Sequence, residues 1–167
     1  MATSNTNGLR HALSHARQKG RCDTISAKDK KTIVQRAEEL WNTGNLAIAD
    51  EIHATDFVNH DPGDPDVRDL ETYKGFIAAV RTSFPDFRVT IEDMIAEGDR
   101  VAIRWTARGT HQGELMGIPP TGRQATWTTM TIYRFAGSKI VEAWWSKDIL
   151  GLLVQLGVVP PPGQGGE

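Results

Sequence analysis

Three positions combine side chains that can transfer protons with neighbours that suit this chemistry. His60 precedes Asp61 in the run Asn-His-Asp-Pro, and a histidine beside a carboxylate can carry a proton. Alternatively, Asp61 starts the turn at Pro62 and His60 only packs nearby. Asp148 precedes an apolar run, so it suits either a base in an apolar cavity or, more commonly, a helix N-cap. His111 lies in a glycine-rich connection and faces either a cavity mouth or solvent.

The sequence lacks the patterns of several other chemistries. The acids around His60 match neither a zinc site nor a calcium loop, so we expect no metal. The glycines after residue 108 precede no helix that could hold a phosphate, and the single cysteine, Cys22, lies outside the predicted folded body. We therefore expect any reaction to proceed without a cofactor.

Length and charge indicate one globular domain. The chain has 167 residues and a formal net charge of −2, which excludes the strongly basic footprint of a nucleic-acid binder. No apolar run approaches the roughly 18 residues of a membrane span, and we expect a cytoplasmic protein. We divide the chain into a basic extension over 1–25, a folded domain over 26–158 and a Pro/Gly-rich tail over 159–167. A transit peptide or a nucleic-acid arm is the alternative interpretation of the extension.

The first half of the predicted domain is helical. Ser26 and Asp29 form a capping-box pattern before an apolar stripe of helical spacing, and Gly44 is typical of a helix end. Further helices are predicted over about 45–53 and 69–83, with a short strand over 57–60.

The hydrophobic period changes from 3.6 to 2 after Pro85. Alternating apolar and polar residues predict four strands, around 87–92, 101–106, 124–135 and 139–147. A closing helix follows Asp148 and ends at Gly157. Helices followed by long antiparallel strands indicate an α+β fold.

The run from Phe84 to Gly157 resembles the SnoaL-like polyketide cyclase family of the nuclear transport factor 2-like superfamily. The similarity is carried by "GTHQGELMGIPPTG" and by "QLG" after the last strand, and it extends over about 27–158. This resemblance implies a cone-shaped, curved mixed sheet wrapped around three N-terminal helices, with a short C-terminal helix. It also implies an apolar cavity inside the cone and a homodimer.

The resemblance also identifies the positions of the family's chemistry. The cyclases use an aspartate on the last strand and a histidine on the strand before it. Aligned on the two motifs, these positions fall on Trp145 and Thr131. Neither side chain transfers a proton at neutral pH, so the family's aldol ring closure is not expected here.

We therefore expect a cavity protein that acts on a small, largely apolar polyketide-like or ester-containing molecule, as a cyclase, isomerase or hydrolase. His60 and Asp148 are the candidate acid and base. The candidate cavity lining is Trp145, Tyr133, Trp105, Phe57, Met116, Met130, His111 and Thr131. The rival hypotheses are a non-catalytic binding protein for a small apolar or aromatic molecule and a dimerisation module. A titratable group inside the cavity would favour the enzyme.

Overall fold

The computed structural model describes residues 25–161 and 163. Almost all of the predicted N-terminal extension and most of the tail lie outside the described residues. No helix in the described part of the chain has the length and hydrophobicity to cross a membrane. The elements, in chain order, are α2 (Ala27–Thr43), α3 (Ala47–Ile52), β1 (His53–His60), α4 (Leu70–Ser83), β2 (Arg88–Glu97), β3 (Arg100–Thr110), β4 (Gln124–Ala136), β5 (Lys139–Lys147) and α5 (Ile149–Leu156).

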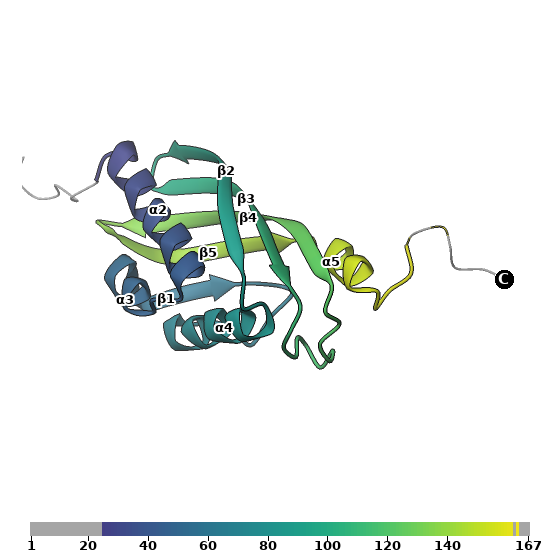
Figure 1. Ribbon diagram of the computed structural model, residues 1–167. Helices are drawn as coiled ribbons and strands as arrows, with labels where there is room; N and C mark the ends of the chain where they lie inside the picture. The colour runs from purple at the N-terminus through teal and green to yellow at the C-terminus, as the bar shows by residue number, and fades with distance from the viewer. Residues whose placement is uncertain (1–24, 162, 164–167) are drawn as a thin grey trace, which may run out of the picture.

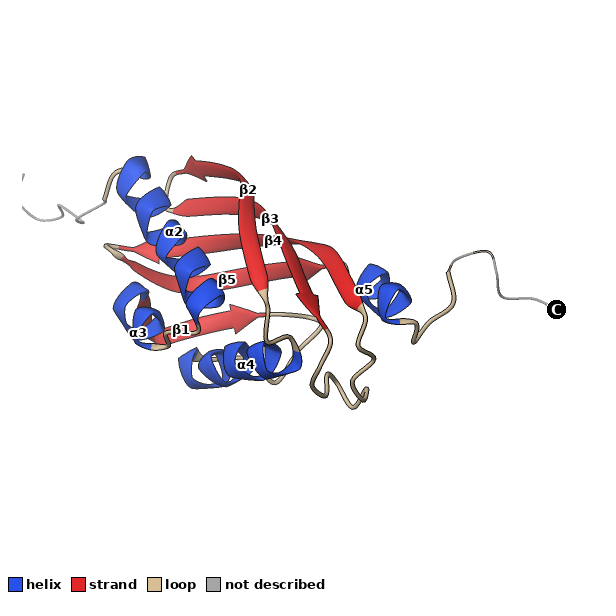
Figure 2. Ribbon diagram, viewed as in Figure 1, coloured by secondary structure: helices blue, strands red, loops and turns tan. Residues whose placement is uncertain are grey.

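A curved five-stranded sheet carries the fold, with the strand order β1-β5-β4-β3-β2. β1 runs parallel to β5, and the other neighbouring strands are antiparallel. Figure 1 shows α2 crossing in front of the sheet, α4 running beside β1, and α5 at the far end of β4. Figure 2 shows the same arrangement with helices in blue and strands in red. The α+β prediction is confirmed, including its mixed sheet and short C-terminal helix.

Local capping explains where the helices begin. The Ser26 hydroxyl accepts a hydrogen bond from the Asp29 amide at 3.1 Å, and the Asp29 carboxylate accepts one from the Ser26 amide at 3.2 Å. This confirms the predicted capping box. Gly44 ends the same helix in the left-handed conformation, with φ of 71°. α4 begins with an equivalent box at Asp69 and Thr72.

The start of β1 differs from the sequence-based prediction. We expected His53 on a helix and the strand to begin at Phe57, whereas β1 starts at His53. His53 pairs with Ile140 of β5, and its Nδ1 lies 3.0 Å from the carbonyl oxygen of Ala49 in α3. The long-range pairing with β5 therefore extends the strand beyond its local signal.

The two faces of the sheet differ in their side chains. Along β4, buried Trp127, Thr129, Thr131 and Tyr133 alternate with outward residues such as Met130. The inward residues pack against α2 and α4 and form the core. This alternation decides which predicted site residues reach the interior.

Candidate functional site

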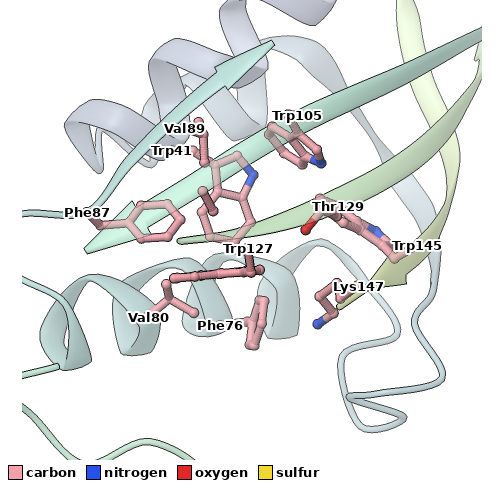
Figure 3. Close-up of a pocket in the computed structure, with 11 residues that line it drawn as sticks. Trp41, Phe76, Val80, Phe87, Val89, Trp105, Trp127, Thr129, Trp145 and Lys147 are labelled. Carbon is pink, nitrogen blue, oxygen red and sulfur yellow. The ribbon is translucent and has the colours of Figure 1, made fainter. Parts of the chain in front are cut away.

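A cavity lined by aromatic rings lies between the inner face of the sheet and helices α2 and α4 (Figure 3). Its volume is about 60 Å³. Most of its lining is apolar, which suits an apolar ligand. The lining residues are Trp41, Phe76, Val80, Phe87, Val89, Trp105, Ala107, Trp127, Thr129, Trp145 and Lys147.

The tryptophans in the wall come from four different elements and pack against one another. Trp41 of α2 meets Trp105 of β3 edge to face, with ring centroids 6.1 Å apart. The rings of Trp105 and Trp145 of β5 have centroids 5.3 Å apart, and their planes are tilted by 31°. Trp127 of β4 lies on the opposite side, where it packs against Phe87 at 5.9 Å. Edge-to-face and offset contacts of this kind hold the rings in defined orientations.

Two of the indoles are oriented by buried hydrogen bonds. The Trp145 Nε1–H donates to the Asn59 side-chain oxygen at 2.7 Å, which connects β5 to β1. The Trp41 Nε1–H donates to the Tyr73 hydroxyl at 3.0 Å, and burial raises the pKa of that phenol. These bonds satisfy polar groups that would be costly to bury unpaired.

A lysine lies at one end of the cavity. Lys147 is the last residue of β5, and its side chain is 9% exposed. Its Nζ lies 2.6 Å from a carboxylate oxygen of Asp61, contacts Asp64, and sits 4.6 Å from the centroid of the Phe76 ring. The two carboxylates and the ring therefore hold the ammonium group in place.

The cavity is small for a ring-shaped ligand. Its volume of about 60 Å³ is below the roughly 150 Å³ of an apolar protein cavity that holds benzene. A ring-sized ligand therefore needs part of the wall to move. Phe76 is suited to this because it is only partly buried and packs against the outside of the buried core.

No group of three or more His, Cys, Asp or Glu side chains among the described residues is arranged to hold a metal ion. Within residues 25–161, Lys147 is the one ionisable side chain that lines the cavity. The cavity itself can stack a flat apolar group and offer hydrogen-bond donors at one end.

Comparison with known proteins identifies the family. The sequence profile of the SnoaL-like polyketide cyclase family matches residues 31–156. The chain belongs to this family.

Relatives in the same family include curated enzymes. The chain is 27% identical over 139 residues to the aklanonic acid methyl ester cyclase DnrD of Streptomyces peucetius, covering 80% of this chain and 94% of the cyclase. Among solved structures, it resembles IdmH of Streptomyces antibioticus, which is proposed to be a polyketide cyclase. That match has 36% identity and a TM-score of 0.70, and covers 77% of this chain and 99% of IdmH. AclR of Streptomyces galilaeus, proposed to be a hydroxylase, has 31% identity, a TM-score of 0.73, and coverage of 81% and 85%.

The residues expected to line the SnoaL-like cavity fall into four groups in the structure. Trp105 and Trp145 lie in its wall. Tyr133, Thr131 and Phe57 are buried in the protein interior and are not among the lining residues of this cavity. Within the described part of the chain, the Thr131 and Tyr133 hydroxyls have no hydrogen-bond partner.

His60 and Met130 are placed on the outer face of the sheet. The His60 ring is stacked on Trp144 at 5.1 Å, and its Nε2 lies 2.9 Å from a carboxylate oxygen of Glu142. Met130 is 56% exposed. Successive residues of a strand point to opposite faces, so the inward neighbours are Asp61 and Thr131 instead. We expected both outward residues near the cavity, and this placement corrects that expectation.

His111 and Met116 lie in the connection between β3 and β4, away from the cavity lining. His111 is buried, which lowers the pKa of its imidazole, and its Nδ1 accepts a hydrogen bond from the Thr121 amide at 3.2 Å. Met116 is exposed and has a positive φ of 52°. His111 therefore stabilises the connection from inside through its hydrogen bond with Thr121, and Met116 lies on the protein surface.

Asp148 caps α5. Its carboxylate accepts a hydrogen bond from the Gly151 amide at 2.8 Å, and the side chain does not line the cavity. Of the two roles that the sequence left open, the geometry supports the cap.

Substitution of Asp148 tests this role. We expect Asp148→Ala to lower the free energy of unfolding by about 0.5–2 kcal/mol, because the first turn of α5 loses its acceptor. Asp148→Asn should retain most of the stability, since asparagine is also a good N-cap. Urea denaturation of the three proteins measures the difference. Equal losses in both variants would show that the charge of Asp148 matters more than its cap.

Sequence reasoning missed part of the site. The apolar stripe after Ser26 includes Trp41 and predicts only a helix core, and Lys147 is not among the candidate residues. The strand period contained a usable signal, because Lys147 shares the inward parity of Trp145. The carboxylate of Asp61 was noticed only as the neighbour of His60.

Proposed function

We propose that this protein binds a small, largely apolar, polyketide-like or ester-containing molecule in its aromatic cavity. It acts on that molecule without a cofactor, as a cyclase, isomerase or hydrolase. The aromatic lining is the observation that carries the proposal, because four tryptophans and two phenylalanines surround one cavity in a SnoaL-like fold. Such walls suit flat apolar molecules.

We further propose that Trp145 replaces the proton-transfer aspartate of the family. Thr131 and Trp145 are direct partners across β4 and β5, as expected for the histidine and aspartate positions of the cyclases. The Trp145 indole can donate a hydrogen bond but cannot abstract a proton, and its N–H is already engaged by Asn59. The aldol route of the family therefore lacks its base at this position.

Incubation with aromatic polyketide methyl esters and lactones tests the proposed activity. Product masses separate hydrolysis from the other two reactions. Cyclisation by addition and isomerisation leave the mass unchanged, hydrolysis of a methyl ester releases methanol and leaves the lighter acid, and hydrolysis of a lactone adds one water. We expect binding followed by one of these changes without added cofactor. Aldol closure of an anthracycline-type methyl ester at an ordinary enzymatic rate would contradict the proposed role of Trp145.

The alternative is a non-catalytic binding protein. It is favoured by one observation: among the described residues, no carboxylate or imidazole lines the cavity. Saturable binding of the same esters with no change in product mass would support this alternative over the enzyme.

We also predict a homodimer formed through the outer face of the sheet. Ile132 and Ile95 are 39% and 69% exposed on this face, and Trp144 lies beside them on β5. Apolar side chains gathered on one face mark an interaction surface. Sedimentation at micromolar concentration should show a dimer, and Ile132→Lys should shift it toward the monomer. A wild-type monomer under these conditions would contradict the prediction.

A further inference from the structure

We propose that Lys147 and Thr129 form a binding site for a carbonyl oxygen at one end of the aromatic cavity. The inference rests on the proposed function and adds the chemical group that the ligand must present. It predicts a neutral ligand with an aromatic or other flat apolar body and a carbonyl at its edge.

The ammonium group of Lys147 has donor capacity beyond its two ion pairs. It carries three N–H donors, and Asp61 and Asp64 each accept from it. The side chain lines the cavity, and Nζ lies 4.6 Å from the centroid of the Phe76 ring in its wall. Because both carboxylates fix the side chain before a ligand arrives, little conformational freedom remains to be lost on binding.

Thr129 adds a second donor beside it. Thr129 and Lys147 are direct partners across β4 and β5, and both line the cavity. Figure 3 shows the Thr129 oxygen and the Lys147 nitrogen on the side of the cavity that holds Trp145. Thr129 is only 6% exposed, and it borders the cavity. A carbonyl oxygen in the cavity could accept a hydrogen bond from its hydroxyl.

The combined charge of Lys147, Asp61 and Asp64 favours binding of a neutral carbonyl compound over binding of a free carboxylate. One ammonium and two carboxylates give a net charge of −1 at the end of the cavity. An entering carboxylate would be repelled by Asp61 and Asp64, whereas a ketone or ester would meet only the donors.

A matched pair of ligands tests the site. Acetophenone and α-methylstyrene have nearly the same shape, but the second carries a methylene group in place of the carbonyl oxygen. Binding is followed through the indole N–H signals of a ¹⁵N-labelled protein, with Trp144 on the outer face as the internal control. We expect acetophenone to bind about tenfold more tightly than α-methylstyrene, as a hydrogen bond to a charged group provides. Benzoate should bind more weakly than acetophenone.

Substitution of Lys147 tests whether this residue causes the tighter binding of acetophenone than of α-methylstyrene. Lys147→Met should bind both neutral ligands equally, while Lys139→Met, at the other end of β5, should keep the tenfold preference. If the single variant does not fold, Lys147→Met with Asp61→Asn removes the buried charge together with its partner. An unchanged preference in a folded Lys147 variant, or no preference in the wild type, would overturn the inference. If neither neutral ligand shifts the cavity indoles, the proposed function itself fails.

Discussion

Replacing Trp145 by alanine is expected to remove most of the affinity for flat aromatic ligands. The indole forms one wall of the cavity, lies 5.3 Å from Trp105, and is held by Asn59. Loss of its stacking and contact area should weaken binding about tenfold or more. The same change should cost about 3–5 kcal/mol of folding free energy, because a large buried ring is deleted. Quenching of tryptophan fluorescence by the ligand measures the affinity.

Trp144 provides the matched control. It is the preceding residue of the same strand and carries the same ring, but it faces the outer side, where it stacks on His60. Trp144→Ala should therefore leave the affinity nearly unchanged. Trp145→Phe should recover much of the stability and part of the affinity if the alanine variant does not fold. Equal losses of affinity in Trp144→Ala and Trp145→Ala would place the ligand elsewhere.

Acidification from pH 7.5 to pH 5 is expected to cost about 2 kcal/mol of folding free energy through His53. Burial lowers the pKa of this imidazole from 6.5 to about 4, so the folded protein holds it neutral. The unfolded chain takes up the proton first, so the stabilisation is complete above pH 6.5 and is lost as the pH falls toward 4. Urea denaturation at the two pH values measures this loss.

A substitution isolates the contribution of His53 from that of other groups. His53→Gln retains a side-chain donor for the Ala49 carbonyl but does not titrate, so its stability should change much less over the same range. An identical pH dependence in the wild type and His53→Gln would show that other groups control acid unfolding.

Much of the fold could be predicted because its signals are local. The Ser26 capping box involves residues three positions apart, and the change to a period of two after Pro85 marks the strands within a few residues. The start of β1 could not be found in this way. His53 joins the sheet because Ile140 of β5 pairs with it, and no nearby residue contains that information.

The site was harder to predict than the fold. His60 lies on the outer face of the sheet, whereas the carboxylate of the next residue, Asp61, contacts Lys147 at the cavity. Successive side chains of an extended chain point in opposite directions, so an error of one residue exchanges the two faces. Lys147 was overlooked for a different reason. A lysine at the end of a strand is usually solvated, and its burial here depends on Asp61 and Asp64, which lie more than 80 residues earlier in the chain.

The parallel pairing of β1 with β5 has a consequence for synthesis of the protein on the ribosome. The hydrogen bond from the Trp145 indole to Asn59 cannot form until Trp145, 86 residues after Asn59, has been synthesised. β1 therefore leaves the ribosome long before its only strand partner in the described sheet exists. Until β5 follows, its open edge is exposed to other chains, and closing so long a loop slows folding. A chain released before β5 would lack both Trp145 and Lys147, so the site is completed only after β5 has been made.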